Sequence, residues 1–407
     1  MTTIDHDELR RYADVMLRCG VNLESGQKLV VMGDVGHADL VAALVEAAFE
    51  RGCPRVETVF ADERVSAAQA AGAPSDEAAK QLPVGYEELF ETVIAERWAR
   101  VRTEGDVHEG AFAAVPPVRA SAQAAARLAL VFRTMEAGLN WSLCPCPTAG
   151  WARRIYGSPD VERLWADLRV ALRLDEPDPV AAWQARREEL TARAAGLDRA
   201  AFVALRFVGG PTDLRVPLHA DARWRTAWLT SAWGGWFLCN LPTEEVYTAP
   251  DWRGVEGVAA VTRPVVVNGV TVEDLRLRFS AGLIVDVEAA ANVDAARASI
   301  GHDPGASRLG EVALVDGSSR VGAVGRVFQE TLLDENAASH IAWGAAIDDA
   351  FPEGISDDDA QAVARGVNRS DVHEDVMIGG PHVAVYGISA AGDEVPVIVA
   401  DRWRLDS

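Results

Sequence analysis

Acidic and histidine side chains gather in four segments of the second half of the chain, and these residue types can bind divalent metal ions. The first segment, residues 309–315, is an apolar run with Glu311 near its start. If this run is a buried strand, a carboxylate there is costly unless it is paired, protonated or bound to a cation. The alternative is a glutamate at a strand end that reaches solvent, which is the usual environment of this residue type.

His340 lies in the second segment, residues 334–344, which begins with acidic residues and continues with alanines. This composition predicts the first turns of a helix. On a helix, Asn336, His340 and position 347 would share one face. A lone histidine on such a face is more often a hydrogen-bonded core residue than a metal ligand, so this segment alone does not predict a site.

His373 and Asp375 lie in the third segment, residues 368–380. In a strand, side chains two residues apart point to the same face, so this pair could bind one metal ion. The pattern is weak alone, because the chain has 8 histidines and many acids.

Glu244 and Glu245 lie in the fourth segment, between Pro242 and Pro250. In an extended segment they face opposite ways, so only one of them is expected at any given site. Two adjacent glutamates usually lie in a solvated loop, but the apolar neighbours here predict an ordered, partly buried one.

Taken together, two glutamates, one aspartate and two histidines form a ligand set that suits a pair of divalent ions such as Zn, Co or Mn. Paired ions recur in aminopeptidases and phosphatases. Other chemistries lack their motifs: no G-x-S-x-G predicts a serine nucleophile, and no G-x-G-x-x-G follows a predicted strand.

The elements that must position these residues fall into two parts. Predicted helices cover residues 7–19, 39–49, 86–98, 160–172 and 180–197, predicted strands cover 28–32 and 55–60, and 61–84 is predicted as a surface connection. After residue 200 the pattern is richer in strands, predicted over 201–208, 213–218, 258–267 and 275–284. The fold class predicted is an N-terminal open α/β domain, residues 1–200, followed by a strand-rich α+β metal-binding domain, residues 201–407.

The amino-acid composition limits the kinds of partner that the protein is expected to bind. The 407 residues include 61 acidic and 39 basic side chains, a net charge of −22. This charge argues against nucleic acid and anionic membranes as partners. The acidic start lacks an apolar core, no apolar run is long enough to span a bilayer, and 5 cysteines do not form a disulfide framework. These features predict a cytoplasmic protein.

The four segments resemble the aminopeptidase T and aminopeptidase S family of metallopeptidases. The family patterns, with their positions here, are N-x-P-T-E-E-V-[FY]-T-A-P at 240–250, L-G-E-V-A-L-V at 309–315, D-E-N-A-x-x-H at 334–340 and N-x-S-x-x-H-x-D-x-M-I-G at 368–379. The resemblance covers nearly the whole chain.

The resemblance implies a metallo-aminopeptidase that hydrolyses the N-terminal peptide bond of peptides, with two divalent ions as cofactors. It implies that the metal ligands are Glu245, Glu311, His340, His373 and Asp375, of which the two glutamates are also the expected catalytic carboxylates. It further implies a homodimer whose active sites face an enclosed cavity.

Two positions depart from the family pattern. Ile347 stands where the family usually has a tyrosine, and Gln329 stands where it usually has an aromatic residue. Isoleucine cannot donate a hydrogen bond to a developing oxyanion, and losing one such donor costs about a hundred- to a thousandfold in rate. Tyr247 and Tyr386 are candidates to replace the missing hydroxyl, and Glu244 or Glu374 could transfer the proton.

Two other functions remain open. Relatives in the same fold use one iron ion to open dihydroxypyridine rings with oxygen, and His340, His373 and Asp375 could form that site. Retention of both Glu245 and Glu311 argues against it. The other alternative is a non-catalytic dimeric binding protein that keeps the metal for stability.

Overall fold

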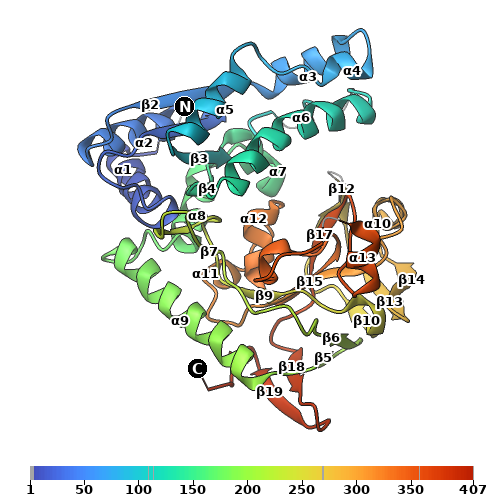
Figure 1. The fold of residues 1–407 in the computed structure, drawn as a ribbon. Coiled ribbons are helices and arrows are strands. Elements are labelled where there is room, and N and C mark those ends of the chain that lie inside the picture. Colours follow the sequence, from blue (N-terminus) through green and yellow to red (C-terminus); the bar gives the residue numbers. More distant parts are fainter. Residues whose placement is uncertain (1–3, 109, 113, 268–269, 357, 407) are drawn as a thin grey trace. The chain divides into compact units, whose positions relative to one another are not determined.

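The computed structural model describes residues 4–108, 110–112, 114–267, 270–356 and 358–406 (Figure 1). The chain divides into two compact units. The first contains residues 1–184 and 228–241, and the second contains residues 185–227 and 242–407. The predicted boundary at residue 200 is the end of one long helix, α9 (Pro179–Ala200), whereas the second unit begins inside that helix.

The first unit alternates helices and strands. Its elements are α1 (His6–Val15), the π-helical turn η1 (Met16–Gly20), β1 (Leu29–Asp34), η2 (Val35–His37), α2 (Ala38–Glu50), β2 (Val56–Ala61), α3 (Glu63–Gly72), α4 (Asp76–Ala79), α5 (Tyr86–Ala95), β3 (Ala99–Glu104), α6 (Pro117–Glu136), β4 (Trp141–Pro145), α7 (Ala149–Tyr156), α8 (Val161–Ala171), β7 (Trp228–Thr230) and β8 (Trp236–Leu238).

The strands of the first unit confirm the predicted open α/β architecture. The main sheet has the order β2–β1–β3–β4, and each neighbouring pair is parallel. Val30 and Met32 of β1 pack with Phe90 and Val93 of α5, so this helix covers one face of the sheet. A short parallel bridge between Leu143 and residue 240 joins the β7–β8 hairpin segment to the edge of this sheet.

The prediction of a surface connection over residues 61–84 is wrong, because this stretch contains α3 and α4. Both helices begin at side-chain caps: Asp62 accepts hydrogen bonds from the backbone N–H groups of α3, and Ser75 accepts one in α4. Such caps satisfy backbone donors that the first turn leaves free. The caps were visible in the sequence, but the mixed Ala, Gly and Pro composition hid the helical pattern.

Arg100 is a costly feature of the first sheet. Its side chain is buried, and none of its three guanidinium nitrogens has a hydrogen-bond partner among the described residues. Its guanidinium carbon lies 5.4 Å from the centre of a Trp141 ring. Burial, and after it the charge of Arg102, lowers the pKa of Arg100 to about 10. The folded state therefore holds this charge at a free-energy penalty.

We expect Arg100→Leu to stabilise the protein by about 1–3 kcal/mol, because it replaces an unpaired buried charge with an apolar side chain. Differential scanning calorimetry would measure the change. The matched control is Arg102→Leu in the same strand, since Arg102 is half-exposed and pairs with Glu104. Lower stability of Arg100→Leu would show that the contact with Trp141 outweighs the desolvation cost.

The second unit is rich in strands, as predicted. Its elements are α9 from residue 185 onward, β5 (Ala204–Gly209), β6 (Thr212–Pro217), β9 (Val246–Thr248), η3 (Trp252–Gly254), β10 (Glu256–Ala260), β11 (Val265–Val267), β12 (Val270–Val272), β13 (Arg276–Ser280), β14 (Leu283–Glu288), α10 (Val293–Ile300), β15 (Leu309–Leu314), α11 (Arg320–Val324), α12 (Thr331–Asp334), η4 (Glu335–Ala337), β16 (His340–Gly344), η5 (Asp348–Ala350), α13 (Asp359–Ala364), β17 (His373–Met377), β18 (Ala384–Ile388), β19 (Glu394–Val399) and β20 (Arg402–Trp403).

Two larger sheets of this unit share one hydrophobic core. One has the order β14–β13–β10–β6–β5–β18–β19–β20, and the other has the order β17–β16–β15–β9. Phe207 and Leu214 from the first sheet belong to the same buried cluster as Val312, Ile341 and Trp343 from the second. One face of the second sheet is therefore buried in the core, and its other face is not part of this core.

Three predicted elements of this unit are corrected by the structure. The predicted strand over 275–284 is the β13–β14 hairpin, which turns at Ala281 and Gly282 with positive φ. The predicted strand over 258–267 is divided between β10 and β11. The predicted helix over 334–344 ends early, because His340 begins strand β16 between β15 and β17. Pairing with two neighbouring strands outweighs the weak helix preference of this segment.

In the part of the chain that the structure describes, no helix combines the length and the apolar character that a membrane span requires.

Candidate metal centre

The candidate site is built on the free face of the β17–β16–β15–β9 sheet. In the strand register, Ala342 of β16 lies opposite Asp375 on one side and Glu311 on the other. His340 and His373 lie on the same face, because each is separated from a member of this row by two residues along its strand. The small side chain of Ala342 leaves space between the two carboxylates.

Glu311 is buried within its strand and does not reach solvent. The residue is only 5% exposed, so the alternative of a solvated strand-end glutamate is wrong. The neighbouring Val312 and Leu314 enter the hydrophobic core on the other face. Since the side chains of a strand alternate, this packing directs Glu311 to the free face.

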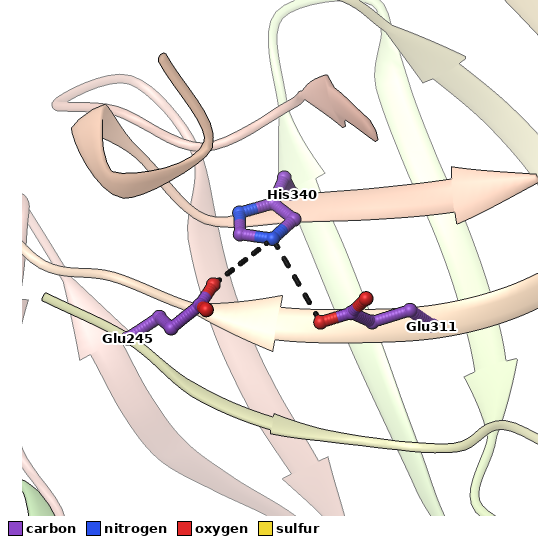
Figure 2. Close-up of side chains that lie close together, drawn as sticks. All are labelled: Glu245, Glu311 and His340. Atoms are coloured by element: carbon purple, nitrogen blue, oxygen red, sulfur yellow. Dashed lines mark ion pairs between the residues drawn. The ribbon is translucent and has the colours of Figure 1, made fainter. Parts of the chain in front are cut away.

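The ligand-type side chains converge on His340. Its Nε2 lies 3.1 Å from Oε2 of Glu245, 4.0 Å from Oε1 of Glu311 and 3.8 Å from Oδ1 of Asp375. Figure 2 shows the carboxylates of Glu245, just before β9, and of Glu311, in β15, directed towards the imidazole. The side chains of His340 and both glutamates are almost fully buried.

His373 completes a second group. Its Nε2 lies 3.1 Å from Oε2 of Glu311 and 3.6 Å from Oδ1 of Asp375. The other ring nitrogen, Nδ1, is 2.9 Å from the carbonyl oxygen of Ala345. In the same way, Nδ1 of His340 is 3.2 Å from the carbonyl oxygen of Ala338. Such contacts fix the ring orientation and direct Nε2 of each histidine towards the carboxylates, where it can bind a metal.

The five predicted ligands therefore form two overlapping groups. Glu245, Glu311 and His340 bring one ligand atom each within 4.8 Å of one another, and Glu311, His373 and Asp375 do the same. Glu311 belongs to both groups and offers a different oxygen to each histidine. A carboxylate in this position can bridge two ions.

A cation would satisfy the ligand atoms of this group better than their contacts with one another do. Oε2 of Glu245 and Oδ1 of Asp375 are buried and have no hydrogen-bond partner among the described residues. Although His340 is close to both, it does not have the alignment of a hydrogen bond to either. Buried carboxylate oxygens that accept no hydrogen bond are rare, and a divalent cation at their meeting point would satisfy them.

The charges within the group shift its titration strongly. Burial opposes the charged form of His340, but Glu245 and the other two carboxylates outweigh it and raise its pKa to about 10. Burial raises the pKa of Glu311 to about 7, against the effect of His373. Without a cation, the group therefore binds protons in place of a metal.

Glu335 is a further acid that the sequence reasoning did not single out. Burial, followed by the carboxylates of Glu245 and Asp375, raises its pKa well above the usual range. Nδ2 of Asn336 donates to its Oε1 at 3.3 Å. Glu335 and Asp375 help line a cavity of about 20 Å³, together with Glu374. A cavity of this size has room for about one water molecule.

Glu244 and Glu245 point in opposite directions, as predicted. The carboxylate of Glu244 is fully buried and lies 2.6 Å from Nε of Arg186, and it also accepts a hydrogen bond from the backbone N–H of Arg320. The backbone N–H of Glu244 donates to Oδ1 of Asn336 at 2.6 Å. Glu244 therefore anchors the segment that presents Glu245, and its carboxylate is not free to transfer protons.

The positions that depart from the family pattern are placed as follows. Ile347 is not on a helix with His340, so the argument that the two share a helical face is wrong. Tyr386 lies in β18 of the other sheet, whereas Tyr247 lies in β9 beside the site. Gln329 has a positive φ of 53° and precedes helix α12.

Comparison with known proteins supports the interpretation of these residues as part of a metallopeptidase. Residues 5–403 match the model of the thermophilic metalloprotease (M29) family. The chain is 36% identical to aminopeptidase T of Thermus aquaticus over 98% of each chain, and 31% identical to aminopeptidase PepS of Streptococcus thermophilus over 98% of each chain. Its structure is similar to that of wild-type AmpT from Thermus thermophilus, with a TM-score of 0.87, 33% identity and coverage of 98% of this chain and 99% of that chain.

Proposed function

The chain belongs to the thermophilic metalloprotease (M29) family, and from this premise we propose that it is a metal-dependent aminopeptidase that hydrolyses the N-terminal peptide bond of peptides. The observation that carries the proposal is the position of Glu311 between two groups of ligand-type side chains. A single buried carboxylate shared in this way suits a pair of ions.

Each ion would have three ligands from the chain. Glu245, Glu311 and His340 would hold one, and Glu311, His373 and Asp375 would hold the other. Carboxylate and imidazole ligands suit Zn, Co or Mn. When bound, such a pair polarises a carbonyl oxygen and lowers the pKa of a water molecule.

Glu335 is the residue that we assign to proton transfer. In this assignment its carboxylate accepts a proton from the attacking water and returns it to the nitrogen of the leaving amine. Its hydrogen bond from Asn336 orients the carboxyl, and Asn336 also binds the backbone of the segment that carries Glu245. Asn336 thus couples the position of the proton carrier to that of a metal ligand.

Two expectations remain as proposals. The resemblance to the family implies a homodimer whose active sites face an enclosed cavity, and the composition of the chain predicts a cytoplasmic location. Analytical ultracentrifugation would test the first.

Restoration of activity by metal tests the proposed function. The protein is stripped with a chelator, and hydrolysis of a broad panel of aminoacyl p-nitroanilides is measured after addition of Zn, Co or Mn. We expect restored hydrolysis and about two ions per chain by elemental analysis. Failure of every metal to restore hydrolysis of any substrate would contradict the proposal. One Fe per chain with substrate-dependent oxygen uptake would indicate the ring-opening alternative.

A further inference from the structure

We propose that Asp349, held in place by the hydroxyl of Tyr247, binds the free α-ammonium group of the substrate. The proposal rests on the proposed function and adds a binding site for the amine to it. It would explain how the enzyme selects peptides with a free N-terminus.

Tyr247 lies on the same face of the sheet as the candidate ligands. In the strand register, Ala313 of β15 lies opposite Tyr247 on one side and opposite His340 on the other. Glu245 precedes Tyr247 by two residues, so the two side chains leave the extended segment on the same side. Tyr247 is buried, with 8% of the residue exposed.

The hydroxyl of Tyr247 fixes one oxygen of Asp349 and leaves the other without a partner. Oη of Tyr247 donates to Oδ2 of Asp349 at 2.7 Å. Oδ1 of Asp349 is buried and has no hydrogen-bond partner among the described residues. Nε of Arg225 donates to the main-chain oxygen of Asp349 at 2.9 Å. A buried carboxylate oxygen in this state attracts a hydrogen-bond donor, and most strongly a charged one.

The surroundings favour a cation at this oxygen. Burial raises the pKa of Asp349, the hydrogen bond from Tyr247 and the charge of Arg225 oppose this rise, and the charges of Asp348 and Glu245 add to it. The effect of Glu245 places Asp349 within electrostatic reach of a candidate metal ligand. A bound ammonium would offset the desolvation of the carboxylate through N–H donors. The peptide bond next to this ammonium is the one that an aminopeptidase cleaves. An acylated N-terminus carries no positive charge and would not satisfy Asp349.

The experiment compares two inhibitors that differ only in the amine. The probes are leucine hydroxamate and 4-methylpentanoic acid hydroxamate, which has the same carbon skeleton without the amine. Isothermal titration calorimetry measures their binding to the metal-loaded wild-type protein and to Asp349→Asn. The matched control is Asp348→Asn, since Asp348 is exposed and pairs with Arg369.

We expect Asp349→Asn to weaken binding of leucine hydroxamate by about ten- to a hundredfold, the range for loss of a hydrogen bond between charged groups. Binding of the amine-free hydroxamate should change less than about threefold. Asp348→Asn should behave like wild type. Tyr247→Phe, which removes the hydroxyl that positions Asp349, should raise KM for a leucyl anilide more than it lowers kcat.

Equal weakening of both hydroxamates by Asp349→Asn, or of neither, would overturn the proposal. The calorimetric result does not depend on turnover, so it separates failure of this proposal from failure of the proposed function. If Asp349→Asn does not fold, the Tyr247→Phe variant provides the same comparison, and an unchanged preference for the amine would then contradict the role of Asp349.

Discussion

Glu311→Gln is expected to reduce kcat/KM for an aminoacyl p-nitroanilide by at least about a thousandfold, because the substitution removes the carboxylate that both groups of ligands share. Glutamine keeps the shape of the side chain but cannot bridge two cations with two anionic oxygens. We therefore also expect the metal content to fall from about two ions per chain to about one or fewer. Steady-state kinetics and elemental analysis on the same samples would measure both changes.

Stability without metal distinguishes a metal ligand from a structural residue. In the ion-free protein, burial raises the pKa of Glu311 to about 7, so its charged form destabilises the fold as the pH rises above the value of an unfolded glutamate. Ion-free Glu311→Gln should therefore be at least as stable as ion-free wild type at pH 8. Metal should then stabilise wild type more than the variant.

The exposed Glu394 of β19 offers a control with the same chemical change. Glu394→Gln should retain activity and metal content. Full activity and two ions per chain in Glu311→Gln would refute the shared-ligand arrangement.

Glu335→Gln is expected to lower kcat by about a hundred- to ten-thousandfold while the metal content stays unchanged. The reason is that Glu335 lines the small cavity beside Asp375 but is outside both ligand groups. Its raised pKa keeps a proton available in the absence of cations, and a bound pair of ions would lower that pKa towards the working pH. Kinetics under saturating substrate would measure the change.

Glu374 supplies the matched control, because it lines the same cavity and burial raises its pKa to about 7. It alternates with His373 and Asp375 along β17, so its side chain leaves the strand on the face opposite to the ligands and reaches the cavity only because β17 lies at the edge of its sheet. Glu374→Gln should therefore lower kcat far less than Glu335→Gln. The reverse order would assign the proton transfer to Glu374, which the sequence had suggested as a candidate.

The sequence was most informative where chemistry and strand periodicity agree. His373 and Asp375 were expected on one strand face, and Glu244 and Glu245 on opposite sides, because alternation in extended chain is local geometry. The α/β character of the first unit followed from buried apolar runs such as β1. These inferences need no knowledge of distant contacts.

Other features depended on contacts that the sequence does not contain. The segment that carries His340 reads as a helix by composition, but pairing with β15 and β17 makes it a strand. Glu335 and Asp349 can be recognised as functional candidates only from their burial and from neighbours that are distant in the sequence. The D-E-N-A stretch of the family pattern contains Glu335, but its residue types alone give no reason to choose this acid over its neighbours.

Residues 228–241 belong to the first unit, although part of the second unit precedes them in the sequence. This order has a consequence for folding during synthesis. During synthesis, the hairpin that extends the edge at β4 leaves the ribosome only after part of the second unit has already emerged. The first unit therefore cannot complete its fold before residues 185–227 of the second unit have been synthesised. For the same reason, no single cut in the chain releases either unit whole, and limited proteolysis between residues 184 and 242 should yield fragments that remain associated.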